Sequence, residues 1–126
     1  MHVPDELRYT SDHEWVKLEG TKVRIGITDY AQDALGDVVF VQLPEPGSRY
    51  DGGQTFSEVE STKSVSDIFA PLAGKVVEVN GELVDSPQLL NQDPYGEGWI
   101  ALIEPDDAEA YGRLLDAAAY QTLISD

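Results

Sequence analysis

A single lysine, Lys63, lies in the middle of a segment whose pattern predicts a β-hairpin. Apolar and polar residues alternate on both sides of it between residues 56 and 69, with the two-residue period of β-strands. Tight hairpin turns favour glycine or asparagine because they need positive φ, and Thr62-Lys63 offers neither residue. We therefore interpret Lys63 as a residue with a functional amine, which the hairpin presents at its tip.

Three roles for this amine are open. It can be an ordinary exposed turn lysine, which is the commonest role of any one lysine. It can be a catalytic amine that forms a Schiff base, but such an amine must lose its proton readily, and the nearby Glu58, Glu60 and Asp67 favour the charged form. It can also be acylated by another enzyme and carry a long cofactor arm. The small residues beside Lys63 leave room for that enzyme.

Composition narrows the function classes. The 126 residues suit one domain over residues 1–126, and the net charge of −16 makes nucleic acid and anionic membranes poor partners. The simplest reading of the acidity is that it keeps the protein soluble. The chain has no cysteine, so disulfides, zinc–thiolate sites and a cysteine nucleophile are excluded, and any thiol chemistry must come from a cofactor.

The remaining chemistry-bearing residues predict little. His2 and His13 are too isolated to indicate a metal site. A small hydrolase that uses the abundant carboxylates would still need a histidine, a cysteine or a nucleophile elbow, and we find no suitable candidate. The acidic start resembles no targeting segment, and the apolar run at 100–103 stops at Glu104, so we expect a soluble cytoplasmic protein.

Several further elements are expected around the Lys63 hairpin. Residues 15–18 and 23–27 predict an N-terminal hairpin, and Thr28 can cap a short helix near 29–35 that ends at Gly36. Strands are expected at 38–43, 75–79 and 99–103, and C-terminal helices after the potential caps Asp107 and Asp116. A faint likeness between residues 50–57 and 84–91 suggests a β-sandwich or flattened barrel made of two related halves.

The segment 52–64, followed by Ala70-Pro71-Leu72-Ala73-Gly74, resembles a lipoyl domain. Its Glu60-Ser61-Thr62-Lys63 turn is similar to that of the glycine cleavage H-protein family, and residues 13–16, 26–41 and 91–99 agree with the same family. The resemblance implies a mainly β, lipoyl/biotinyl-like barrel-sandwich hybrid with the N-terminal hairpin and small helices outside it.

The resemblance also implies a cofactor and its site. Lipoate would be joined to Lys63 as an amide, and the attaching enzyme would recognise some of its neighbours, namely Glu60, Ser61, Thr62 and Gly52. Glu14 could face the cleft where a loaded arm rests, although an exposed acid in a structural pair is an equal alternative. Members of the family often carry a histidine at the position of Ala34, so any shelter that depends on that imidazole is absent in this chain.

The implied activity is that of a carrier with no catalytic residues. A pyridoxal-phosphate-dependent glycine decarboxylase would load an aminomethyl group on the arm. An aminomethyltransferase would pass the carbon to tetrahydrofolate, and dihydrolipoamide dehydrogenase would reoxidise the dithiol. We expect a monomer, since a carrier visits several enzymes in turn. An H-like protein that relays lipoate to other lipoate-dependent enzymes shares every motif and stays open as an alternative.

Overall fold

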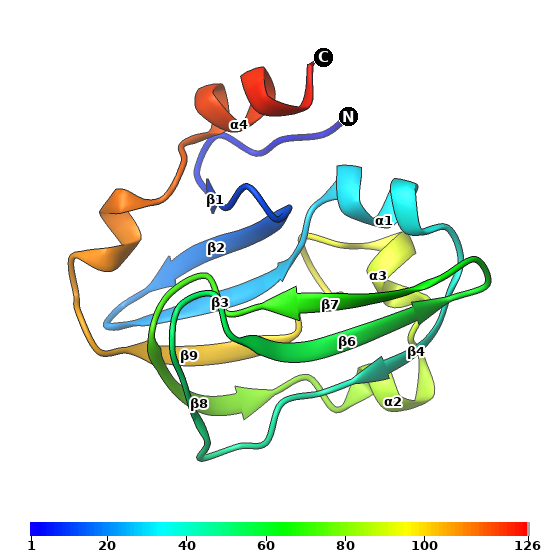
Figure 1. Cartoon of the computed structure of the whole chain (residues 1–126), viewed down its shortest axis with the longest axis horizontal. Coiled ribbons are helices and arrows are strands. Elements are labelled where there is room, and N and C mark those ends of the chain that lie inside the picture. Colours follow the sequence, from blue (N-terminus) through cyan, green and yellow to red (C-terminus); the bar gives the residue numbers. More distant parts are fainter. Residues whose placement is uncertain (126) are drawn as a thin grey trace.

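The computed structural model describes residues 1–125 and consists mainly of antiparallel strands in two sheets (Figure 1). The larger sheet has the order β1-β2-β3-β9-β8-β5, and the smaller one has the order β4-β6-β7. The larger sheet comprises β1 (Arg8–Tyr9), β2 (Glu14–Glu19), β3 (Lys22–Ile27), β9 (Ala101–Pro105), β8 (Gly74–Val79) and β5 (Arg49–Tyr50). The smaller sheet comprises β4 (Val38–Gln42), β6 (Thr55–Ser61) and β7 (Val65–Phe69).

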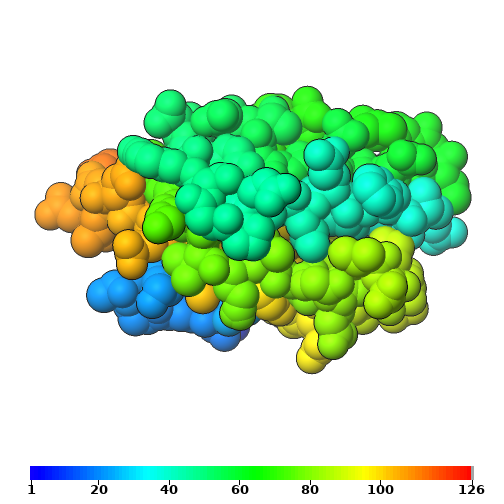
Figure 2. All heavy atoms as spheres, turned by 90° about the horizontal axis from the view of Figure 1, so that it is seen from below, coloured from blue at the N-terminus to red at the C-terminus, as the bar shows by residue number. Residues whose placement is uncertain are grey.

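The two sheets form the two layers of the molecule. Figure 2 shows the teal and green segments that carry β4, β6 and β7 as the upper layer, with the blue and lime segments of the larger sheet below. Buried and exposed residues alternate over the first part of β8, as a sheet with one buried face requires, whereas Glu14, Trp15 and Val16 of β2 are buried in succession because the chain ends cover Trp15. The inward-facing residues of both sheets are buried. They form one apolar core that includes Val41, Val59, Val76, Ile25 and Ile103.

Helix α1 (Asp29–Leu35) connects β3 to β4 and has the two ends that its sequence predicts. The Thr28 hydroxyl accepts a hydrogen bond from the Ala31 N–H at 3.1 Å, which satisfies a free donor of the first turn. The helix ends at Gly36, whose φ of 83° is a conformation that favours glycine. Together these ends fix where the chain leaves the helix toward β4.

The ends of the chain form a second, smaller apolar cluster beside β1 and β2 (Figure 1). Tyr9 stacks on Tyr120 with 4.6 Å between ring centroids, and the Trp15 indole N–H donates to the Pro94 carbonyl at 2.8 Å. Tyr120 belongs to helix α4 (Ala117–Ile124), which begins after the Asp116 cap. Within residues 1–125, no helix is long and apolar enough to cross a membrane.

Most predicted elements are confirmed, including both hairpins, α1 and α4. The helix expected after Asp107 is a short 3₁₀ helix, η1 (Ala110–Arg113). Two four-residue helices, α2 (Glu82–Asp85) and α3 (Leu89–Gln92), are additions that we did not predict. They also show that the proposed internal repeat was wrong, because residues 50–57 include strands whereas 84–91 lie mostly in helices.

Candidate functional site

The Lys63 turn joins β6 to β7, and the Ser61 side chain holds it together. The Ser61 hydroxyl accepts hydrogen bonds from the backbone N–H groups of Lys63 and Ser64, both at 3.1 Å. The Ser61 N–H also donates to the Ser64 carbonyl at 2.8 Å. A serine hydroxyl that bonds nearby backbone groups can stabilise a turn without glycine. These hydrogen bonds explain why the turn is stable although Thr62 and Lys63 at its tip are not residues that favour tight turns.

A second contact ties the turn to the rest of the protein. The Thr62 N–H donates to the Asp37 carbonyl at 3.0 Å, which connects the turn to the loop between α1 and β4. The exposed Lys63 side chain passes over Gly36 at the end of α1. A Cβ placed on Gly36 would lie only 2.9 Å from the Lys63 Cε atom. The end of α1 therefore contacts the outer part of the lysine side chain, next to its amine.

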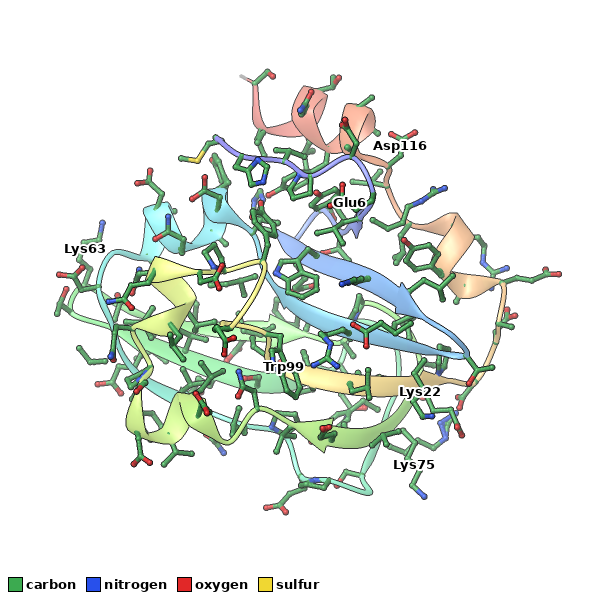
Figure 3. The ribbon with its side chains drawn as sticks, turned by 180° about the vertical axis from the view of Figure 1, so that it is seen from behind. Glu6, Lys22, Lys63, Lys75, Trp99 and Asp116 are labelled. Carbon is green, nitrogen blue, oxygen red and sulfur yellow. The ribbon has the colours of Figure 1, made fainter. Side chains whose placement is uncertain are left out.

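The Lys63 amine itself is unobstructed. Figure 3 shows the labelled Lys63 side chain extending from the periphery of the molecule. None of the three ion pairs found among residues 1–125 includes it. An exposed amine is accessible to an enzyme that modifies it, and Lys63 does not have the burial that commonly activates a catalytic amine.

A cavity of about 220 Å³ opens beside the turn. One wall comes from α1 and the other from the start of β7 and the residue before it. Apolar side chains dominate the first wall, and hydroxyl and carboxylate groups line the second. The lining residues include Ala31, Ala34, Leu35, Ser64, Ser66 and Asp67. Ala34 contributes only a methyl group at the position where the resemblance implies that a histidine is common, and the cavity is present with alanine there.

Glu14, the first residue of β2, is buried and only 1% exposed. One carboxylate oxygen accepts a hydrogen bond from the Thr10 hydroxyl at 2.7 Å, and the other accepts one from the Phe69 N–H at 3.1 Å. Burial raises the pKa of Glu14 to about 7, and these two hydrogen bonds only partly oppose the shift. Glu14 is thus not the exposed strand acid that we kept as an alternative.

Glu14 lines a different cavity from the one beside Lys63. This second cavity has a volume of about 260 Å³, and Asp12 lines both cavities. The neighbouring His13 lines the first cavity together with Tyr30. His13 lies just before β2 and Glu14 is the first residue of that strand, and these two neighbours face two separate spaces.

Sequence reasoning gave no role to His13, and the structure gives it a defined position. Its φ of 70° makes it the one non-glycine residue with positive φ among residues 1–125. Its Nδ1 atom lies 2.9 Å from the Tyr120 hydroxyl, and its ring lies 4.7 Å from that of Tyr30. Burial lowers the pKa of His13. The partner Tyr120 is 107 residues away, so no local pattern could have indicated this contact.

The predicted recognition residues divide into two groups. Glu60, Ser61 and Thr62 lie in or next to the Lys63 turn, as the sequence order requires. Gly52 lies before β6, at the end of that strand opposite the turn. The seven residues of β6 correspond to roughly 20 Å at about 3.3 Å per residue. The structure therefore does not bring Gly52 together with Lys63.

Two antiparallel sheets packed on one core, with an exposed lysine at a hairpin tip, define a carrier domain of the lipoyl and biotinyl barrel-sandwich class. Residues 7–126 match the sequence model of the family described as glycine cleavage H-protein. The chain belongs to the glycine cleavage H-protein family.

Individual relatives agree over nearly the full length. The chain is 50% identical over 126 residues to a glycine cleavage system H protein of Anaeromyxobacter sp. (strain K), covering 100% of this chain and 98% of that protein. It is 59% identical over 126 residues to one of Nocardia farcinica, covering 96% of each. A crystal structure of a glycine cleavage system H protein from Mycobacterium marinum superposes with a TM-score of 0.87 at 47% identity, covering 95% of this chain and 97% of that one.

Proposed function

We propose that this protein is the lipoyl carrier of a glycine cleavage system, with lipoate joined as an amide to the Nζ atom of Lys63. Membership of the H-protein family supports the role. The position of Lys63 is the main observation that supports this attachment site. Its amine is exposed at the tip of a turn that hydrogen bonds to the Ser61 hydroxyl stabilise. In this role the protein is a subunit that presents a group to enzymes and has no catalytic residues of its own.

The residues around the turn suit lipoate. Ala34 and Leu35 of α1 give the adjacent cavity an apolar wall for a hydrocarbon arm, and Ser66 and Asp67 of β7 give it polar groups at the other side. When attached, lipoate supplies a disulfide that takes up the aminomethyl group of glycine and ends as a dithiol. The chain's own residues hold the attachment point in place and keep the amine accessible.

The partners of this carrier follow from the proposed role. They are the pyridoxal-phosphate-dependent glycine decarboxylase, the aminomethyltransferase, dihydrolipoamide dehydrogenase and the enzyme that attaches lipoate. Tethering gives the group a high effective concentration at each docked enzyme, which is the physical contribution of a carrier. We expect a monomer that works in the cytoplasm. Acylation of Lys63 removes one positive charge and takes the formal net charge from −16 to −17.

Glu14 fits a role in receiving the loaded arm. Its carboxylate accepts hydrogen bonds from two neutral donors and takes part in none of the ion pairs among residues 1–125. A buried carboxylate is stabilised in its charged form by a nearby cation. We therefore propose that an aminomethyl ammonium group that enters the cavity lined by Glu14 becomes its ionic partner.

Recognition by the attaching enzyme is proposed for the turn. Glu60 and Thr62 are exposed beside Lys63, and Ser61 sets the geometry of the turn from its buried position. Glu60 and Thr62 are close enough to Lys63 for one enzyme surface to contact both of them. A role for Gly52 would require the same enzyme to reach the opposite end of β6.

The proposal is tested by attaching lipoate in vitro. Intact-mass measurement after incubation with lipoate, ATP and a lipoate ligase should show one added lipoyl group on the unaltered chain and none on Lys63→Arg protein. Lys75→Arg is the matched control, because Lys75 is an exposed lysine of β8 in the other sheet, and it should gain one group. A lipoyl group on the Lys63→Arg protein would overturn the site.

The lipoylated protein then distinguishes the carrier from a relay of lipoate. Added to glycine decarboxylase, it should support exchange of the glycine carboxyl carbon with bicarbonate. A fully lipoylated chain that supports no exchange would contradict the carrier role and favour the relay.

A further inference from the structure

The outer face of the small sheet carries exposed apolar side chains next to the Lys63 turn. Phe40 of β4 pairs with Glu60 of β6, and Glu60 pairs with Val65 of β7, so these three residues form one row across the sheet. We call this row the outer row. Phe40 is 53% exposed and Val65 is 56% exposed. Phe40 and Val65 lie on the two edge strands with Glu60 between them, so this face presents two exposed apolar side chains on either side of one carboxylate.

The rim of this surface is acidic. The next row across the same strands consists of Gln42, Glu58 and Asp67. None of the three strands contains a lysine or an arginine, and Lys63 in the turn is the nearest basic residue in sequence to Glu60 and Val65. In Figure 2 this sheet forms the upper layer. A complementary partner surface would place apolar side chains against Phe40 and Val65 and basic side chains around them, opposite the acidic residues.

The outer row lies next to Lys63, where an enzyme that acylates this lysine has to contact the protein. An enzyme that acylates Lys63 must bring its active site to the Nζ atom, where the amine attacks the carbonyl carbon of an activated lipoyl donor. An amide bond forms, the leaving group departs with the bond electrons, and the amine proton passes to solvent. Val65 is only two residues from Lys63 and starts β7. Enzymes that act on the far end of the attached arm do not need to come this close to the Lys63 turn.

We propose that the outer row of Phe40, Glu60 and Val65 docks the enzyme that attaches lipoate to Lys63. That enzyme covers Phe40 and Val65 with apolar side chains and places a lysine or arginine against Glu60. This inference rests on the proposed function, and it adds an apolar contact on the sheet face to recognition of the turn itself.

Matched pairs of variants test the docking surface. Phe40→Ser and Val65→Thr remove apolar area from the outer row. Leu18→Ser and Val77→Thr are their controls, because Leu18 is 51% exposed on β2 and Val77 is 43% exposed on β8, both in the larger sheet. All four positions are exposed, so we expect each variant to fold, and circular dichroism checks this. The measurement is kcat/KM for lipoylation by a lipoate ligase, with the carrier as the varied substrate.

Phe40→Ser should lower kcat/KM about tenfold, and Val65→Thr about threefold. Both should act through KM and leave kcat unchanged, because the contacts stabilise docking and not the acyl transfer itself. Glu60→Gln should lower kcat/KM and weaken its dependence on salt. The two control variants should match the unaltered chain.

The outcomes separate this inference from the proposed function. Efficient lipoylation of the unaltered chain together with equal kcat/KM for Phe40→Ser and Leu18→Ser would overturn the docking surface alone. Absence of any lipoylation at Lys63 would overturn the proposed function and the docking surface with it. If Phe40→Ser is lipoylated normally but supports slower glycine exchange, the outer row serves the decarboxylase, and the proposal as stated is wrong.

Discussion

Replacing Glu14 by glutamine should change how the stability of the protein depends on pH. Glu14 is 1% exposed, and burial raises its pKa from 4.5 to about 7. Glutamine keeps the shape of the side chain and one of its two acceptor oxygens. Its amide oxygen can accept from the Phe69 N–H. Its NH₂ group stands where a carboxylate oxygen accepts from the Thr10 hydroxyl, so that hydroxyl must turn its proton to another acceptor. The substitution therefore removes the titrating charge, and the cost of the altered Thr10 contact is the same at every pH because neither amide nor hydroxyl titrates in this range.

The magnitude follows from the size of the pKa shift. A carboxyl group whose pKa is raised in the folded state binds its proton more tightly there than in the unfolded chain. Its contribution to stability is present below pH 4.5 and is lost as the pH rises through about 7. A shift of about 2.5 units at about 1.4 kcal/mol per unit corresponds to about 3 kcal/mol. The unaltered chain should lose about this much of its free energy of unfolding from Glu14 between pH 4 and pH 8.

Urea denaturation at intervals between pH 4 and pH 8 measures the effect. The Glu14→Gln variant should be more stable relative to the unaltered chain at pH 8 than at pH 4, by about 3 kcal/mol. Burial also lowers the pKa of His13, so His13 makes the opposite contribution and reduces stability as the pH falls below 6.5. Both proteins contain His13, so the difference between them isolates Glu14.

Glu104→Gln serves as the control, because Glu104 is an exposed carboxylate of β9. It should leave the pH dependence unchanged. Parallel stability curves for Glu14→Gln and the unaltered chain across this pH range would refute the reasoning, since they would mean that burial does not destabilise the Glu14 charge.

Two glycine substitutions give further predictions. A Cβ at Gly26 would lie 2.6 Å from the Trp15 indole nitrogen, so Gly26→Ala should lower the free energy of unfolding by about 1–3 kcal/mol in urea denaturation, and an unchanged midpoint would contradict this contact. Gly36→Ala and Gly47→Ala change residues with nearly equal φ of 83° and 88°, so both should lose about 1–2 kcal/mol of stability. Only Gly36→Ala should also slow lipoylation, because its Cβ would displace the Lys63 side chain, whereas Gly47 has open space around it; equal rates for the two variants would show that Gly36 does not position the lysine.

Features with strong local signals could be predicted from the sequence. Thr28 and Gly36 delimit α1 by the capping preferences of their residue types, and the alternation on both sides of Lys63 identifies its hairpin. Helices α2 and α3 were missed because four residues are too few to show a helical period. Recognition of the family depended on several motifs in the right order and not on any one of these patterns.

The site was predicted less completely than the fold. We noticed that Thr62-Lys63 was unsuitable for a tight turn and did not recognise that Ser61 stabilises it. The signal was available in the sequence, as a serine two residues before the tip lysine, but hydroxyl-braced turns have weak residue preferences. Glu14 to Phe69 spans 55 residues, so its hydrogen bond depends on the packing of the two sheets. No local pattern contains that information.

The anchoring of the Lys63 turn has a consequence for movement. Ser61 braces the turn internally, and the bond from Thr62 to Asp37 ties it to the loop after α1. A group attached to Lys63 thus rotates about a pivot that is fixed in the frame of the protein. The volume that it can sweep is set by torsions of the side chain and the attached group, and bending of the hairpin adds little. Lengthening β6 and β7 would relocate the centre of that volume without enlarging it.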